Sequence, residues 1–121
     1  MALNRLKEKL TKENLWLYIL FLLERRPLYA YEINARIKNS FGFEPAMITV
    51  YVVLYKMERE GLVLSTTEKR PPSNVVRRYY SPTKLGLEAL KEGKGILRRT
   101  LEQLEPGGAT PSKRDRDAGQ L

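Results

Sequence analysis

The sequence contains no cysteine and no histidine. Without cysteine there are no disulfide bonds. A zinc site is not expected either, because protein zinc sites are built mostly from thiolates and imidazoles. The absence of histidine also removes the commonest general base near neutral pH, and neither a glycine-rich phosphate loop nor an activated nucleophile can be recognised. We therefore predict no catalytic residues, no cofactor and no metal, and we expect that the protein is not an enzyme.

Long apolar runs are also missing. The longest one spans residues 15–23, whereas a helix needs about 20 apolar residues to cross a bilayer. Charged residues and a proline follow it at positions 24–27, where a secretory signal would need small residues at its cleavage site. We predict no membrane partner, no signal peptide and a cytoplasmic location.

Positive charge is what the sequence has in excess. Its 22 lysines and arginines against 14 acidic residues give a net charge of +8. This balance favours a polyanionic partner, either nucleic acid or an anionic membrane surface, and does not choose between the two. A chain of 121 residues with a hydrophobic share of 42% fits one domain with a small core and extensions.

Helical periodicity dominates the first half of the chain. Leucines at positions 3, 6 and 10 predict a short amphipathic helix. Residues 14–25 are apolar nearly all round, which is typical of a helix buried on every side, and we expect part of it to meet a second copy of the chain. Another helix is expected over residues 30–41, with Gly42 ending it.

The stretch 49–62 organises the rest of the chain. Apolar residues at positions 50, 53, 54 and 57 share one helical face, Pro45 suits the first turn, and Gly61 suits a left-handed cap. Two strands are expected over residues 62–68 and 75–80, joined by basic turn formers at 69–74. Thr83 can cap a last helix. In that helix we expect a bend, a break or a close helix crossing at Gly93 and Gly95.

This order of elements is that of a winged helix. The helices over 30–41 and 49–62, joined by a short turn, fit a helix-turn-helix whose second member enters the major groove, and the basic hairpin is the wing. We divide the chain into an N-terminal amphipathic extension (1–13), a winged helix-turn-helix DNA-binding domain (14–82), a C-terminal helix (83–105) and a tail (106–121). The tail has almost nothing to bury and is expected to be disordered.

Three segments carry a family resemblance. Residues 22–33 read LLERRPLYAYEI, residues 49–62 read TVYVVLYKMEREGL, and residues 77–86 read RRYYSPTKLG. They resemble the motifs L-L-x-x-x-P-x-Y-G-Y-E-L, T-L-Y-P-x-L-x-x-L-E-x-x-G-L and R-K-Y-Y-x-L-T-x-x-G of PadR-type transcriptional regulators, in the family's order and spacing. Ala30 stands at a usual glycine and Val52 at a frequent proline. Gly93 and Gly95 depart from the family's long, unbroken dimerisation helix.

The resemblance implies a mainly α (α+β) fold, a winged helix-turn-helix with additional N- and C-terminal dimerisation helices. It further implies a sequence-specific transcriptional regulator, usually a repressor, that binds a near-palindromic operator in double-stranded DNA as a homodimer. In the family, the dimer contacts come from the first and last helices. We therefore expect the dimer interface to include Leu3, Leu6, Leu10, Trp16, Leu20, Leu97, Leu101 and Leu104.

Readout of the major groove uses exposed side chains near the start of the recognition helix. The residues expected there are Met47, Ile48, Thr49 and Val52, with Lys56 one turn further on. Because they are mostly apolar, we predict contacts with thymine methyl groups. The hydroxyls of Tyr51 and Tyr55 are expected on phosphates, unless the two rings only cap the core.

The wing is expected to follow phosphates or to enter the minor groove. Its candidate residues are Lys69, Arg70, Arg77 and Arg78. Arg77 and Arg78 alternate along a strand, so at most one of them points toward DNA. The alternative is that the basic tip only serves solubility.

Two questions stay open at this point. Trp16, the single tryptophan, either fills the core or forms the wall of a pocket for a small aromatic effector at the dimer interface. The domain itself is either a specific regulator, a winged-helix module for protein interaction, or a non-specific architectural DNA-binding protein.

Overall fold

The computed structural model describes residues 1–107 of the chain. Residues 1–90 form one compact unit, and residues 91–107 belong to a second. The predicted tail, residues 106–121, lies outside the described residues except for its first two positions. Among residues 1–107, no helix combines the length and the hydropathy that a membrane crossing requires.

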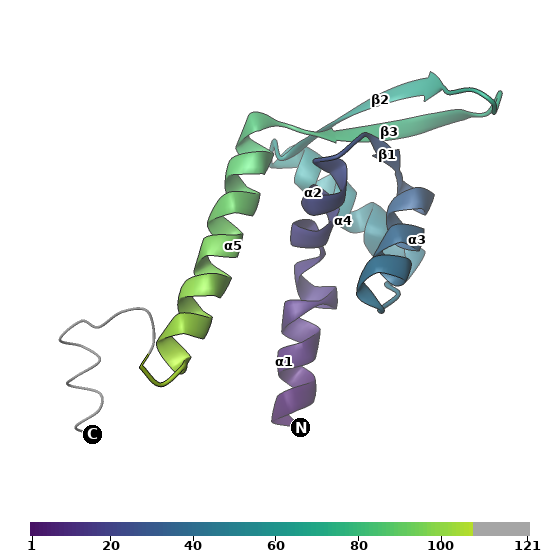
Figure 1. Cartoon of the computed structure of the whole chain (residues 1–121). Coiled ribbons are helices and arrows are strands. Elements are labelled where there is room, and N and C mark those ends of the chain that lie inside the picture. The colour runs from purple at the N-terminus through teal and green to yellow at the C-terminus, as the bar shows by residue number, and fades with distance from the viewer. Residues whose placement is uncertain (108–121) are drawn as a thin grey trace. The chain divides into compact units, whose positions relative to one another are not determined.

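The first unit holds five helical segments, three strands and the start of a further helix (Figure 1). They are α1 (Ala2–Leu10), the 3-10 helix η1 (Lys12–Asn14), α2 (Leu15–Leu23), β1 (Leu28–Tyr29), α3 (Ala30–Phe41), α4 (Met47–Arg59), β2 (Val63–Lys69) and β3 (Val76–Pro82). Helix α5 (Lys84–Leu104) begins in this unit and continues into the second. The order matches a winged helix-turn-helix.

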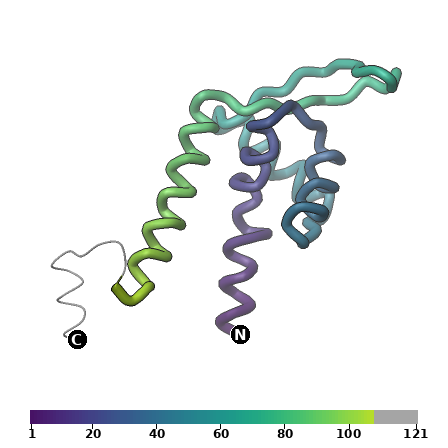
Figure 2. The backbone as a smooth tube through the Cα atoms, viewed as in Figure 1, coloured from purple at the N-terminus to yellow at the C-terminus, as the bar shows by residue number. Residues whose placement is uncertain are grey.

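The sheet is antiparallel, with the strand order β1-β3-β2. The pairs Val63–Pro82 and Lys69–Val76 mark the two ends of the β2–β3 register, and the outer part of this hairpin projects away from the helices (Figure 2). The sequence predicted the hairpin but not β1, which pairs Leu28 with Tyr80. A strand of two residues is too short to show an alternating pattern, which explains why it was missed.

The core is built around α2, which packs against α3, α4 and β3. Ile19 and Leu20 are completely buried there, whereas Phe21 is 40% exposed. Helix α2 is therefore covered mostly by its own chain. Our placement of Leu20 at the dimer interface is wrong, because neighbouring elements of the same protomer already enclose its side chain.

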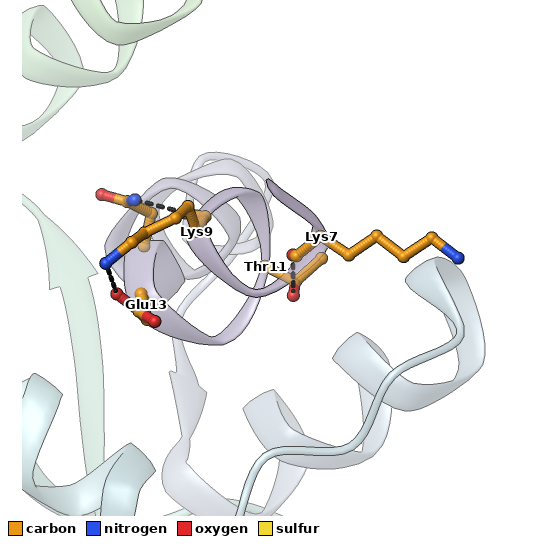
Figure 3. A network of polar contacts seen from close by, with 5 residues as sticks. Lys7, Lys9, Thr11 and Glu13 are labelled. Carbon is orange, nitrogen blue, oxygen red and sulfur yellow. Dashed lines mark hydrogen bonds and ion pairs between the residues drawn. The ribbon is translucent and has the colours of Figure 1, made fainter. Parts of the chain in front are cut away.

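Helix α1 differs from α2, because none of its residues is buried. Its C-terminal end is held by polar side chains (Figure 3). Thr11 Oγ1 donates to the Lys7 carbonyl at 2.6 Å, and Lys9 Nζ lies 2.7 Å from a Glu13 carboxylate oxygen. The Asn14 side-chain amide also donates to the Lys9 carbonyl. These bonds fix the connection between α1 and α2, although no residue of α1 is buried.

Glycines end α3 and α4 where the sequence predicted it. Gly42 has φ of 78° and Gly61 has φ of 80°, a left-handed conformation that side chains with a Cβ disfavour. Between the two helices, Pro45 is buried and Ala46 is the N-cap of α4. The helix starts at Met47, so Pro45 precedes it by two positions and does not occupy its first turn.

The start of α5 is locked onto the end of α4. Thr83 Oγ1 donates to the Gly61 carbonyl at 2.6 Å and accepts from the Gly86 backbone N–H at 2.9 Å. The Thr83 backbone N–H donates to the Leu62 carbonyl at 3.0 Å. The predicted cap at Thr83 is confirmed, and this side chain also joins two distant parts of the chain.

Helix α5 runs without a break through Gly93 and Gly95 to Leu104. Of the three alternatives expected there, a bend, a break or a close helix crossing, the break does not occur. Each glycine costs about 1 kcal/mol in a helix interior but keeps its backbone hydrogen bonds, so the helix can continue. A Cβ added at Gly95 would approach only the Arg99 side chain, which gives no sign of a close helix crossing at that position within the described residues.

Candidate nucleic-acid interface

Helix α4 has one face in the core and one face in solvent. Val50, Leu54 and Met57 are buried. The opposite face is exposed and apolar or aromatic, with exposed fractions of 71% for Ile48, 52% for Tyr51, 45% for Val52 and 62% for Tyr55. We call these four residues the α4 face. All four are among the residues predicted to contact DNA, Ile48 and Val52 on bases and Tyr51 and Tyr55 on phosphates.

The other residues predicted to read bases lie at the margins of this face. Met47 is half-buried, and its sulfur lies 2.8 Å from the Asn34 side-chain amide. Thr49 is half-buried and Lys56 is exposed, on a flank of the helix that adjoins the α4 face. The α4 face itself, without these marginal residues, carries no charged side chain.

In the wing, two of the four predicted cations stack on tyrosines. The Arg77 guanidinium lies 4.5 Å from the centre of the Tyr29 ring, and that of Arg70 lies 4.3 Å from the Tyr79 ring. Arg70 Nε also lies 3.1 Å from a Glu68 oxygen. Hydrogen bonds from Thr66 and Arg70 lower the pKa of the Glu68 carboxyl, which favours its charged form.

The other two cations, Lys69 and Arg78, lie on the opposite face of the hairpin, because side chains alternate along a strand. Arg78 Nη1 donates to Ser65 Oγ at 3.0 Å, and that hydroxyl donates to Glu58 Oε2 at 2.7 Å. Glu58 belongs to α4, so this chain of bonds ties the wing to the recognition helix. Lys69 and Arg78 therefore lie on the side of the hairpin that meets α4.

A hollow of about 460 Å³ separates the start of α3 from the wing. Its lining includes Tyr31, Tyr51, Arg77, Arg78 and Tyr80. Burial raises the pKa of the Tyr80 hydroxyl, and the charge of Arg78 opposes that shift. Apart from Ala30 and Val76, the side chains that line the hollow are phenols and guanidiniums, which are groups that donate hydrogen bonds to anionic oxygens.

Tyr31 is a candidate that the sequence reading missed. It is 68% exposed and lines the same hollow as Tyr51. Its neighbours Ala30 and Ile33 are buried. Position 31 lies on the other side of the helix from Ile33. The helical spacing of the buried residues therefore places Tyr31 outside the buried face.

Trp16 lines a second hollow, of about 430 Å³. Its indole N–H donates to Asn14 Oδ1 at 3.1 Å. The walls also include Lys12 from η1 and Val53 and Lys56 from α4. The hollow thus adjoins both the α1–α2 connection and the recognition helix. Residues 1–107 contain no acidic cluster able to hold a metal ion.

Comparison with known proteins decides the family. A family model described as "Transcriptional regulator PadR-like family" matches residues 19–92. The chain belongs to this family. The predicted resemblance and the winged-helix fold are therefore confirmed, and the PadR-like chain is a member of a family of transcriptional regulators.

Solved structures agree with this assignment. A PadR-like transcriptional regulator from Bacillus cereus is 30% identical, with a TM-score of 0.64 over 77% of this chain and 92% of its own. A PadR family regulator from Clostridium difficile is 27% identical, with a TM-score of 0.67 over 74% of this chain and 92% of its own. PadR from Bacillus subtilis, solved in complex with operator DNA, is 25% identical, with a TM-score of 0.58 over 64% of this chain and 45% of its own. No curated protein matches the PadR-like chain.

Proposed function

We propose that this PadR-like chain is a cytoplasmic, sequence-specific regulator that binds double-stranded DNA as a homodimer and represses transcription from a near-palindromic operator. The observation that carries the proposal is the α4 face, an exposed apolar and aromatic surface on a helix-turn-helix, next to a cationic wing. In Bacillus subtilis PadR the same family fold was solved on operator DNA.

The chemistry of the α4 face suits a DNA groove better than water. Ile48 and Val52 can contact thymine methyl groups, whereas Tyr51 and Tyr55 end in hydroxyls that can donate to phosphates. Tyr31 and Arg78 add donors beside Tyr51 in the hollow next to the wing. In this arrangement the apolar side chains discriminate between base sequences, and the surrounding hydroxyls and guanidinium hold the protein on the DNA backbone.

Two helices support the homodimer. Helix α1 has nine residues and none is buried, and a helix this short is marginal unless another surface covers it. Its exposed leucines repeat at positions 3, 6 and 10, and helix α5 exposes leucines at positions 97, 101 and 104. These are the helices that the family uses for dimer contacts, and we assign both stripes to the interface between two copies.

A binding experiment tests the proposal against its two alternatives. DNA fragments selected by the protein from its own genome would supply an operator, and its affinity is compared with that for random duplex DNA over a salt series. A specific regulator is expected to prefer the operator by about 1,000-fold or more at physiological salt. Equal affinity for both duplexes would instead favour an architectural protein, and no binding to either would favour a protein-interaction module.

A control variant separates readout from backbone contact. Val52→Ala shortens an exposed apolar side chain on the α4 face and should reduce the preference for the operator while leaving the affinity for random DNA nearly unchanged. If both affinities fell equally, the α4 face would not be the reading surface.

The hollow at Trp16 supports a second element of function, a site for a small aromatic effector. A flat ligand could stack on the indole and would then touch α4 through Val53 and Lys56. A ligand that binds one state of this hollow more tightly would bias the position of the recognition helix.

The single tryptophan makes this site easy to follow. Titration with planar aromatic anions and cations should quench its fluorescence and weaken operator binding over the same concentration range. Trp16→Phe keeps an aromatic wall but removes the fluorescence, and it should leave operator binding without ligand unchanged. Quenching without any change in DNA affinity would argue against a regulatory site.

A further inference from the structure

Apart from two tyrosines, Asn34 is the one buried residue with a polar side chain among residues 1–107, with 7% of its surface exposed. It lies on α3. Its amide nitrogen donates to the Pro45 carbonyl at 3.0 Å and lies 2.8 Å from the Met47 sulfur. Its amide oxygen is buried and has no hydrogen-bond partner within the described residues.

The orientation of this amide follows from its neighbours. A proline carbonyl and a thioether sulfur can only accept hydrogen bonds, so the nitrogen must face them and the oxygen must face away. A buried oxygen without a partner is unfavourable for the fold. An apolar residue of similar size would remove this unpaired oxygen but would leave the Pro45 carbonyl without its donor. The two alternatives therefore differ little in cost, and stability alone does not account for an asparagine at this position.

The bonds of Asn34 end at the place where the recognition helix begins. Ala46, the N-cap of α4, makes no side-chain capping bond, and the first helical bonds run from the Thr49 and Val50 N–H groups to the Ala46 carbonyl. The other polar link from α3 to this turn is the exposed ion pair Lys38–Glu44, at 3.5 Å, and such surface pairs hold geometry weakly.

We propose that Asn34 is a positioning residue that fixes the start of α4 relative to α3 and thereby sets how sharply the α4 face discriminates between DNA sequences. It does this from inside the protein, through the Pro45 carbonyl and the Met47 sulfur, and touches no DNA itself. The DNA part of this inference rests on the proposed function, whereas the positioning part does not.

The first experiment uses no DNA. Asn34→Leu replaces one unpaired buried acceptor, the amide oxygen, by another, the Pro45 carbonyl, and adds apolar surface, so overall stability should change little. In this variant the amides of Thr49 and Val50 should exchange hydrogen at least about tenfold faster than in the wild type, while amides in the middle of α4 keep their rates. Unchanged exchange at Thr49 and Val50 would overturn the proposal.

Two further variants keep this result interpretable. Asn34→Ala removes the amide without adding volume, and the same local change is expected even if leucine does not fit. Ile37→Val is the matched control, because Ile37 is a buried residue on the same helix that makes no bond to the turn. It should lower overall stability and leave the ratio of exchange rates within α4 unchanged.

The second experiment measures DNA binding by the full chain. The ratio of operator affinity to random-DNA affinity should fall at least about fivefold in Asn34→Leu and stay constant in Ile37→Val, with the affinity for random DNA unchanged in both. An unchanged ratio in a folded Asn34→Leu protein contradicts the specificity role. If the wild type shows no operator preference, the proposed function fails, and the exchange experiment still decides whether Asn34 positions α4.

Discussion

Gly86 is the residue at which α5 passes closest to the backbone of Leu62. A Cβ added there would lie 2.1 Å from the Leu62 carbonyl oxygen, and the helix would have to move. We predict that Gly86→Ala lowers the free energy of unfolding by about 2–3 kcal/mol, as overpacking of a rigid contact does. Denaturant unfolding at a fixed protein concentration measures this change.

Gly95→Ala is the matched control for Gly86→Ala. At this position the added Cβ would approach only the flexible Arg99 side chain, so alanine should raise stability by up to about 1 kcal/mol through its helix propensity. The same substitution at two positions of the same helix is thus expected to change the free energy of unfolding in opposite directions. Equal losses at both positions would show that the close approach at Leu62 is not what requires a glycine.

Thr83 joins the hairpin return to the end of α4. Thr83→Ala removes the bonds to the Gly61 carbonyl and the Gly86 N–H and should destabilise the protein by about 1–2 kcal/mol, the range found for lost helix caps. Thr83→Ser keeps the hydroxyl and should retain most of that stability in the same unfolding assay. If serine were as damaging as alanine, packing of the methyl group would matter more than the cap.

Single residues were predictable where their role is local. Gly42 and Gly61 act on neighbouring backbone, and so does Thr83 in its cap of the Gly86 N–H, so the sequence around them is sufficient. The second bond of Thr83, to the Gly61 carbonyl, spans 22 positions and was not predicted. Asn34 was not predictable, because its partner Pro45 is 11 positions away and its burial follows from how two helices meet. Tyr31 was missed for a related reason, since a tyrosine at helical spacing looks like a core residue until the buried positions of its helix are known.

In the wing, the fold divides four similar cations into two pairs. Arg70 and Arg77 lie on tyrosine rings, whereas Lys69 and Arg78 are on the face toward α4. We predict that Arg78→Ala weakens binding to operator and random DNA alike and lowers the slope of log affinity against log salt by about 1. Fluorescence anisotropy over a salt series measures both quantities.

Arg70→Ala serves as the comparison for Arg78→Ala. It removes the same charge from the same hairpin, but its guanidinium is already engaged by Glu68 and Tyr79. We therefore expect a smaller change in the salt slope than for Arg78→Ala. A larger change for Arg70→Ala would mean that the opposite face of the hairpin meets the duplex.

Elements were predictable where a periodic pattern is long enough. The helices α3 and α4 and the β2–β3 hairpin follow from such patterns, but the two residues of β1 do not. At Gly93 and Gly95, glycine propensity left a bend, a break or a close helix crossing open, and the helix continues unbroken to Leu104. At Leu20 the apolar pattern correctly predicted burial, but the residues that cover its side chain belong to the same protomer and not to a second copy.

For the whole molecule, the net charge of +8 indicates a polyanionic partner but no specificity. Specificity for a near-palindromic site requires two recognition helices held together, about 34 Å apart along the duplex. The residues that would hold them are the exposed leucine stripes of α1 and α5. In the proposed function, dimerisation is therefore what would turn a basic winged helix into an operator-binding protein.

Leu6→Glu and Leu101→Glu each place a charge in the middle of one leucine stripe. Both variants should sediment as monomers at concentrations where the wild type is a dimer, because a buried unpaired charge is costly. Without the second recognition helix, affinity for the full operator should fall by at least about 100-fold, while affinity for a half-site stays nearly constant. Leu64→Glu, at an exposed leucine of β2 outside both stripes, should remain dimeric. If both stripe variants stayed dimeric, the interface would lie elsewhere on the chain, and the spacing of the two α4 faces would have to follow from that other contact.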